Sequence, residues 1–262
     1  MTKYVCAMLI LALAGCSNPK PSPAGNMDGA YNMLSQTFKG NAIDTTFTAH
    51  KQLKIYAGRY MMYVRVNPAD SVSAFGIGTF SMDSGKLTEN ILYSATDTTE
   101  NTSPFSGTVN IVKNSKGYEQ VIPEIMSDKG KLRLTEEYES VGTNATSPLD
   151  GTWKQTKGYT YKGKDTVYWH TIKYKVFYAG NFVHGNYFSG PGHKSHVVIT
   201  YGIFVMNDSN HIKETITAST STALNGKTVT LDIALQGADA FTQTIAAENG
   251  ATEVDVFRRL RK

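Results

Sequence analysis

The residue types that most often carry chemistry are concentrated in the C-terminal half of the chain. Five of the six histidines lie there, and His193 and His196 stand three positions apart after a Gly-Pro-Gly segment. Two such imidazoles, with His184 or His211 as a third ligand, could hold zinc, which takes three or four nitrogen, sulfur or carboxylate donors. The spacing alone is not specific for a metal, because polar loops also contain it. We therefore expect no metal and no cofactor.

Two glutamates, Glu89 and Glu214, occupy matching positions in the two halves of the chain. An inward carboxylate there could hydrogen-bond a ligand, or act as a general base if burial raised its pKa. A solvated strand face is the simpler explanation of the same residues. Gln120 and Gln243 also match each other and allow the same two interpretations. The sequence contains no Gly-x-Ser-x-Gly elbow and no phosphate-binding loop, so we predict no catalytic residue and expect a protein that is not an enzyme.

These residues belong to one unit that occurs twice in the chain. The segment Asp28-Gly29-Ala30-Tyr31 matches Asp150-Gly151-Thr152-Trp153 at a separation of 122 positions (151 − 29 = 122). Tyr56-Ala57-Gly58 matches Tyr178-Ala179-Gly180 at the same separation (180 − 58 = 122). Each unit has the size of one small domain. We expect a first domain over residues 28–141, a linker over 142–149 and a second domain over 150–262.

Within each unit, apolar residues alternate with polar ones, as they do in half-buried strands, and no long stretch has helical spacing. Turn signals between these runs suit antiparallel hairpins. The predicted class is therefore all-β, with each unit an up-and-down meander closing into a barrel. The predicted strands are 52–66, 73–82, 87–94, 108–112, 118–122 and 132–141 in the first unit, and 166–177, 181–188, 196–206, 211–218, 228–235, 241–246 and 254–260 in the second.

Gly151-x-Trp153 entering a first strand, with Arg258 and Arg259 on a last strand, resembles the signature of lipocalin-like (calycin-type) β-barrels. That resemblance implies two consecutive antiparallel barrels. It also implies that the indole closes one barrel end while a guanidinium lies across it, combining cation–π attraction with donors for loop carbonyls. Trp153 would be the plug, and Arg258 or Arg259 the clasp. A tryptophan in an ordinary sheet core and a solvated basic tail is the alternative.

The first unit departs from this pattern. Tyr31 stands where Trp153 does, and Glu139-Ser140 stands where the arginine pair does. The first barrel is therefore sealed differently or mainly supports the second, and the two need not bind the same ligand. The mouth of an eight-stranded barrel can hold one small ligand. The residues that we expect to line such a site are Tyr56, Tyr60, Tyr178, Phe182, Glu89 and Glu214.

The N-terminus has the pattern of a secreted lipoprotein. Lys3 precedes an apolar run that is too short to span a bilayer, and Leu13-Ala14-Gly15-Cys16 follows. By resemblance to bacterial lipoproteins, cleavage after residue 15 would leave Cys16 carrying diacylglycerol and a fatty acyl chain such as palmitate, which together hold a protein firmly to a membrane. Residues 16–27, with three prolines, read as a flexible tether.

Cys6 lies in the predicted signal and Cys16 would carry lipid, so the mature chain has no disulfide. Losing Lys3 lowers the formal net charge from +4 to +3, which is too weak to indicate a nucleic-acid partner. No acidic cluster follows Cys16. We expect attachment to a bacterial membrane, the outer one, facing the periplasm rather than the cell surface.

These features predict a membrane-anchored lipoprotein of the cell envelope that binds a small apolar or amphipathic ligand in a β-barrel. The alternative is a non-catalytic scaffold or accessory subunit of an envelope or glycan-capture complex, with solid barrels. The expected partners are the membrane, through the N-terminal lipid, and a small apolar molecule or a glycan.

Overall fold

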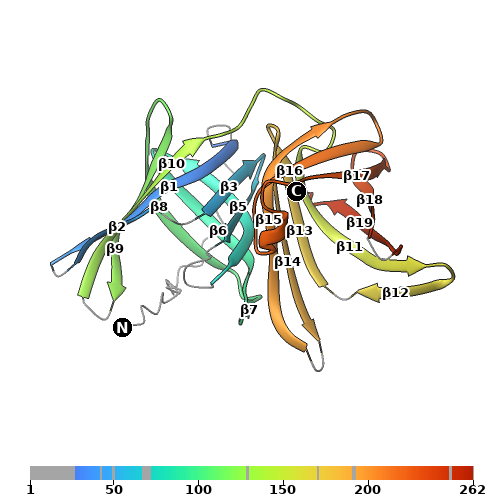
Figure 1. Cartoon of the computed structure of the whole chain (residues 1–262). Helices are drawn as coiled ribbons and strands as arrows, with labels where there is room; N and C mark the ends of the chain where they lie inside the picture. The colour runs from blue at the N-terminus through green and yellow to red at the C-terminus, as the bar shows by residue number, and fades with distance from the viewer. Residues whose placement is uncertain are drawn as a thin grey trace.

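The structure is a computed structural model that describes residues 27–41, 43–48, 51–66, 72–127, 130–169, 171–190, 193–247 and 250–261. These residues form two closed, eight-stranded antiparallel β-barrels in tandem (Figure 1), which confirms the predicted all-β class and is compatible with tandem lipocalin-like domains. The predicted signal segment and Cys16 lie outside the described residues. Within the described part, no helix is long and apolar enough to cross a membrane.

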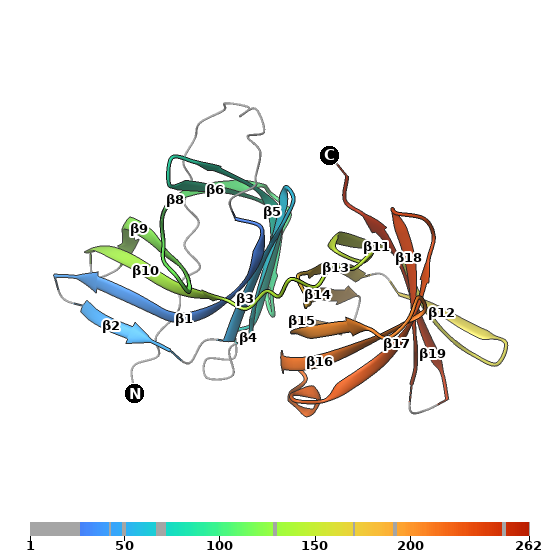
Figure 2. The ribbon, with the colours of Figure 1, turned by 90° about the horizontal axis from the view of Figure 1, so that it is seen from above.

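Barrel 1 is built from neighbouring strands in chain order and closes where β10 pairs with β1. The far half of β1 also pairs with β2, so this hairpin extends beyond the barrel wall (Figure 2). Its strands are β1 (Gly29–Gly40), β2 (Ile43–Phe47), β3 (Lys51–Ala57), β4 (Tyr60–Val66), β5 (Ala74–Asp83), β6 (Lys86–Thr96), β7 (Glu100–Asn101), β8 (Phe105–Lys113), β9 (Gly117–Ser127) and β10 (Gly130–Ser140).

Barrel 2 repeats this plan and closes where β19 pairs with β11, while β12 extends the far half of β11 as a hairpin. One short 3-10 turn, η1 (Thr222–Leu224), follows β16. Its strands are β11 (Gly151–Lys162), β12 (Asp165–Trp169), β13 (Thr171–Tyr178), β14 (Asn181–Gly190), β15 (His193–Met206), β16 (His211–Ser219), β17 (Thr228–Leu235), β18 (Ala240–Ala246) and β19 (Thr252–Arg259).

The predicted strands mostly coincide with observed ones, with three differences. The predicted strand 52–66 is two strands, β3 and β4, because Gly58 has a positive φ of 66° and reverses the chain in a tight turn. The predicted strand 166–177 is likewise divided into β12 and β13. The first strand of each barrel, β1 and β11, was not among the predicted strands, although the matching Asp-Gly segments mark where each begins.

The strand registers show the internal repeat residue by residue. Glu89 pairs with Phe80 and Glu214 with Phe204, so the two glutamates are equivalent, as the sequence predicted. The Tyr-Ala-Gly match is offset by one position. Gly29 pairs with Tyr56 whereas Gly151 pairs with Phe177, so Tyr56 corresponds to Phe177 and not to Tyr178.

The two barrels pack against each other through an apolar interface that the sequence analysis did not anticipate. The outer faces of β3–β6 meet those of β13–β16, and the two views show these strands facing each other (Figures 1 and 2). Leu53, Ile55 and Phe75 from barrel 1 join Val176 and Ile199 from barrel 2 in one core cluster. These strands are thus buried on both faces, as in packed sheets.

Gly185 on β14 shows how close this contact is. A Cβ atom at this position would collide with the Phe75 ring and approach the Met62 methyl group to 2.9 Å. The segment between the barrels is also held in place, since Thr143 N donates to Ala179 O (2.8 Å) and Asn181 Nδ2 donates to Val141 O (3.2 Å). The barrels therefore form one packed unit rather than two independently tethered domains.

Candidate functional site

One end of barrel 2 is closed by Trp153, whose side chain is fully buried. The guanidinium carbon of Arg259 lies 4.0 Å from the centre of the indole ring. Its nitrogens donate to three loop carbonyls, those of Ala238 (2.7 Å), Pro148 (3.0 Å) and Asp150. The indole Nε1 donates to Leu149 O at 2.7 Å. Trp153 and Arg259 together therefore seal this end, with every polar donor of the plug occupied.

The neighbouring arginine does not take part. Arg258 pairs with Lys154, and its side chain is exposed. The equivalent end of barrel 1 has Tyr31 in place of the indole and Ser140 in place of Arg259. Tyr31 is half-buried and makes an edge contact with Tyr118 at 4.9 Å between ring centres. Barrel 1 is therefore closed by tyrosine packing, without a cation across the plug.

Above the plug, both barrels enclose the same buried triad of one lysine, one glutamate and one glutamine. In barrel 1, Lys54 Nζ lies 3.2 Å from Glu89 Oε1 and 3.0 Å from Gln120 Oε1. In barrel 2, Lys175 Nζ lies 2.6 Å from Glu214 Oε1 and 2.8 Å from Gln243 Oε1. The two triads are therefore Lys54, Glu89 and Gln120 in barrel 1, and Lys175, Glu214 and Gln243 in barrel 2. The predicted inward carboxylates are thus partners of buried ammonium groups.

The lysines are the members that sequence reasoning missed. A lysine in a strand usually faces solvent, yet Lys54 and Lys175 are only 4% and 3% exposed. The available signal was the pattern lysine, aliphatic residue, aromatic residue, which occurs as Lys54-Ile55-Tyr56 and Lys175-Val176-Phe177. Aligning Tyr56 with Tyr178 concealed it, because that alignment is one position out of register.

Beyond the triad, the interior of barrel 1 is filled by its own polar side chains. Glu136 accepts hydrogen bonds from Gln36 Nε2 (2.9 Å), Gln120 Nε2 (3.1 Å) and Tyr138 OH (3.0 Å). Gln52 Nε2 donates to Tyr138 OH at 2.7 Å. Such a connected network satisfies most of its own donors and acceptors.

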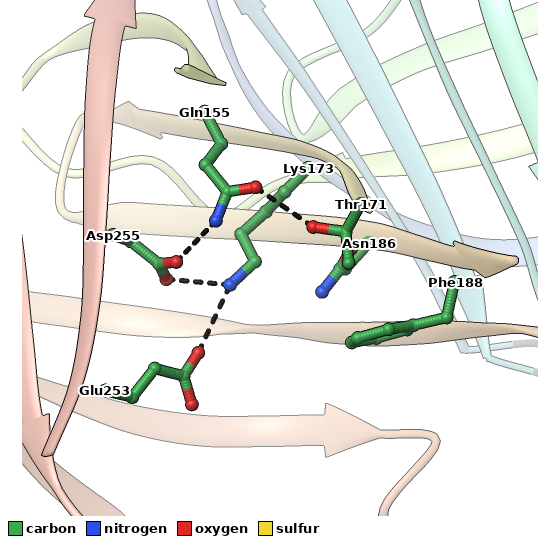
Figure 3. A pocket seen from close by; sticks show the side chains of 7 residues that line it. All are labelled: Gln155, Thr171, Lys173, Asn186, Phe188, Glu253 and Asp255. Carbon is green, nitrogen blue, oxygen red and sulfur yellow. Dashed lines mark hydrogen bonds and ion pairs between the residues drawn. The ribbon is translucent and has the colours of Figure 1, made fainter. Parts of the chain in front are cut away.

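Barrel 2 differs at the same level, because it encloses a cavity of about 100 Å³ at the end opposite the Trp153 plug (Figure 3). Strands β11, β13, β14 and β19 supply its walls. Six of the seven lining residues are polar or charged (Gln155, Thr171, Lys173, Asn186, Glu253 and Asp255), and the seventh is Phe188. The structure thus places the best-supported binding site at the open end of barrel 2.

Lys173 lies at the centre of this cavity, and its ammonium group is paired with two carboxylates. Its Nζ lies 2.7 Å from Asp255 Oδ2 and 3.4 Å from Glu253 Oε1. Gln155 donates to Asp255 Oδ1 at 2.5 Å and accepts from Thr171 Oγ1 at 3.0 Å, so the carboxylate is held from two sides. These contacts fix one wall of the cavity before any ligand enters.

Asn186 contrasts with that wall. It is 3% exposed, and its buried Oδ1 accepts no hydrogen bond from any described residue. Figure 3 shows its amide nitrogen directed toward the space between Lys173 and Phe188. The Phe188 ring at the rim stacks on the His196 ring, with 4.9 Å between centres and 6° between planes. A buried amide with an unused acceptor beside a flat apolar wall is suited to holding a polar group of a ligand.

The predicted ligand-lining residues do not meet at this cavity. Tyr56 and Phe182 are fully buried in the aromatic interiors of the two barrels. Tyr60 and Tyr178 are half-buried outside the barrel interiors, and Tyr60 OH donates to Arg261 O at 2.7 Å. Glu89 and Glu214 belong to the triads. The candidate site is therefore formed by other residues of barrel 2. These residues lie near the predicted positions along the strands, but in a different layer of the barrel interior.

The histidines are dispersed rather than clustered. His211 Nδ1 contacts Asp208 (2.8 Å), and burial beside Lys173 and Lys175 lowers the pKa of His184 well below its ordinary value. The side chains of His170 and His193 lie outside the described part of the chain. Among the described residues, no group of three or more histidine, cysteine, aspartate or glutamate side chains is arranged to hold a metal ion.

Comparison with known proteins names no function for the chain, so the functional argument depends on this geometry. No family model matches the chain, and no curated protein matches it at a significant level.

Proposed function

We propose that this protein is a lipid-anchored binding protein of the bacterial cell envelope that takes a small polar ligand into the open end of barrel 2. The observation that carries the proposal is Asn186, which lines a cavity of about 100 Å³ and whose buried Oδ1 accepts no hydrogen bond from the described residues. A buried polar group left without a partner costs about 1–3 kcal/mol, which ligand binding can recover. Lys173 is already paired with Asp255 and Glu253, so its charge requires no ligand.

The lining combines polar groups with the apolar Phe188 ring, so it favours a ligand that carries polar groups over a wholly apolar one. The aromatic residues that suggested an apolar pocket pack on one another instead. In barrel 2, the Phe177 ring lies 4.8 Å from that of Phe204, and the Trp153 ring lies 4.7 Å from that of Phe241. That aromatic layer forms the closed floor of the barrel, and the cavity above it is lined by amide, hydroxyl and charged groups and by the Phe188 ring.

The anchoring part of the proposal rests on the sequence around Cys16. A single Cys16→Ser substitution tests it, since serine cannot form the thioether to diacylglycerol. We expect the unsubstituted protein to partition with membranes and the variant to appear in the soluble envelope fraction. Partition of both proteins with the soluble fraction would refute anchoring at Cys16.

The alternative, an accessory subunit with solid barrels, has one observation in its favour. The β11–β12 hairpin projects from barrel 2 (Figure 2) and carries Tyr161 and Tyr168 on its outer face, 40% and 57% exposed, with Lys157 5.2 Å from the Tyr168 ring. Exposed aromatic surface of this kind often marks an interaction site. Recovery of a specific envelope partner that is lost on Tyr161→Ser and Tyr168→Ser substitution would favour this function.

The test of the ligand-binding function is native mass spectrometry of the full-length protein purified from its envelope, followed by solvent extraction. We expect a bound small molecule that is lost in an Asn186→Leu variant and retained in a Gln36→Ala variant of barrel 1. Absence of any bound molecule in the unsubstituted protein, together with no binding to a panel of small polar compounds, would overturn the proposal.

A further inference from the structure

We infer that the ligand of barrel 2 is a neutral polyhydroxylated molecule, whose terminal sugar-like unit enters the cavity between Asn186 and Phe188. This inference rests on the proposed function and adds the chemical class of the ligand. It follows from the charge of the lining, the hydrogen-bonding groups that remain unused, and the shape and size of the space.

The charge of the lining excludes an anion. One ammonium, that of Lys173, faces two carboxylates, those of Asp255 and Glu253, at 2.7 and 3.4 Å. Because both oxygens lie within ion-pair distance, the cation is already neutralised and a net negative charge remains. A carboxylate or phosphate on the ligand would enter a site of like charge, which is costly where water is excluded.

The unused groups suit hydroxyls. An asparagine amide offers two donors and an acceptor with two lone pairs. The Oδ1 acceptor of Asn186 is unused among the described residues, and its amide nitrogen is directed into the cavity (Figure 3). The Glu253 side chain is 44% exposed and spends one oxygen on Lys173, so its other oxygen is available to accept at the rim. A hydroxyl group both donates and accepts, so neighbouring hydroxyls can satisfy the amide and the carboxylate together.

The shape of the cavity suits a ring edge. The Phe188 ring, held flat against His196, presents an apolar wall beside these polar groups. The electron-rich face of an aromatic ring attracts the slightly positive C–H groups of a saturated ring. A saturated ring with hydroxyls on its edge therefore matches both walls.

The size of the cavity suits one unit at the end of a longer molecule. Its volume of about 100 Å³ equals that of about three water molecules at roughly 30 Å³ each. Pockets that enclose a whole small ligand usually measure about 300–1,000 Å³. The rest of the ligand would therefore extend past Glu253 and Phe188 into solvent.

The test is saturation-transfer NMR on the full-length protein in a detergent without sugar headgroups, with glucose, galactose, glucuronate and glucosamine as probes. We expect saturation of a neutral sugar and at least tenfold weaker binding of glucuronate. Asn186→Leu and Phe188→Ala should each weaken neutral-sugar binding about tenfold, a typical effect of one hydrogen bond or ring contact. Gln52→Ala in barrel 1 is the matched control and should leave binding unchanged.

Two results would overturn the inference and are distinguishable from failure of the proposed function. Preferential binding of glucuronate or glucosamine at Asn186 would refute the neutral class while keeping the binding site. A different class of molecule found bound in native mass spectrometry, with no sugar binding, would do the same. Absence of every ligand in both experiments would refute the proposed function itself.

Discussion

The two barrels share one plan and differ at both ends. Each has a buried lysine, glutamate and glutamine at its middle, yet barrel 2 has a tryptophan plug with an arginine across it and a cavity at the other end. In barrel 1, tyrosines replace the plug, and Gln36 donates to Glu136 where barrel 2 has Gly158 beside Asp255. Under the proposed function, one copy would stay open for a ligand, while the other is filled by its own side chains and packs against it at the shared interface.

The difference between the plugs predicts the largest effect. Trp153→Ala removes a fully buried indole and should lower the free energy of unfolding by about 3–5 kcal/mol. Tyr31→Ala, at the equivalent half-buried position, should cost less than about 2 kcal/mol. Urea denaturation followed by circular dichroism measures both. Equal losses would contradict the view that only barrel 2 depends on its plug.

The two triads occupy equivalent positions, but their glutamates differ in the hydrogen bonds that they accept. Glu89 also accepts a hydrogen bond from Tyr56 OH at 2.5 Å, whereas Phe177 at the equivalent position in barrel 2 has no hydroxyl. Lys175→Met should therefore destabilise by about 3–5 kcal/mol, since it leaves a carboxylate buried without its cation. Lys54→Met should cost about 1 kcal/mol less, the value of one remaining hydrogen bond.

The control for this pair is Lys175→Met combined with Glu214→Leu, which removes both charges together. Replacing a buried ion pair with apolar residues is often nearly neutral, so the double variant should recover most of the loss. Thermal unfolding of the single and double variants is the measurement. A double variant as unstable as Lys175→Met alone would show that packing, not charge, explains the loss.

The arginine pair provides a smaller effect with an internal control. Arg259→Ala removes the cation–π contact and three hydrogen bonds to loop carbonyls, and should cost about 2 kcal/mol. Arg258→Ala, on the exposed side of the same strand, should change stability by less than about 0.5 kcal/mol. Arg259→Lys should recover only part of the loss, because an ammonium lacks the planar fork. Similar losses at both positions would contradict the assignment of Arg259 as the clasp.

The smallest predicted effect is a difference in pH response. His184 of barrel 2 is equivalent to Tyr63 of barrel 1, since they pair with Lys175 and Lys54. Burial lowers the pKa of His184 below 6.5, so below that pH the unfolded chain takes up a proton that the folded chain does not. This residue should thus destabilise the protein as pH falls below about 6.5, by at most about 1.4 kcal/mol per pH unit.

Tyr63 should change the stability of the protein at alkaline pH. Burial raises its pKa from 10.0 to about 12, so between these values the unfolded chain loses a proton that the folded chain keeps, and stability falls as pH rises. Urea denaturation across pH 5–11 measures both slopes. His184→Gln should flatten the acid slope and Tyr63→Phe the alkaline one. An acid slope unchanged by His184→Gln would contradict the assignment.

Much of the fold could be predicted because it depends on local patterns. Alternating strands, glycine turns and the repeat indicated two barrels, and Gly151-x-Trp153 with a terminal arginine indicated how one of them closes. The interface between the barrels was harder to anticipate, because it is made by outer-face residues such as Leu53 and Ile55 that a single barrel would leave exposed. The sequence of β3 shows one apolar face (Leu53, Ile55 and Ala57) and one largely polar face (Gln52, Lys54 and Tyr56), which for a single barrel suggests the reverse of the burial of both faces that the structure shows.

The cavity could not be predicted from residue types. Lys173, Asn186 and Asp255 are polar residues in strands, which the sequence alone assigns to a solvated face. One glycine shapes the wall of the cavity: a Cβ atom at Gly158 would collide with Gln155 Nε2 and lie 3.3 Å from Asp255 Oδ1. Gly158, the position equivalent to Gln36, thus leaves room for the Gln155 amide beside Asp255, and only the strand register identifies that equivalence.

The exchange of these two residues tests the central claim most directly. Native mass spectrometry of the full-length protein would compare Gly158→Gln, whose side chain would displace the Gln155 amide from the wall of the cavity, with Gln36→Gly, which removes the equivalent side chain from barrel 1. We expect the bound molecule to be lost in Gly158→Gln and retained in Gln36→Gly, with both variants folded by circular dichroism. A ligand retained in a folded Gly158→Gln variant would show that the open end of barrel 2 is not the binding site.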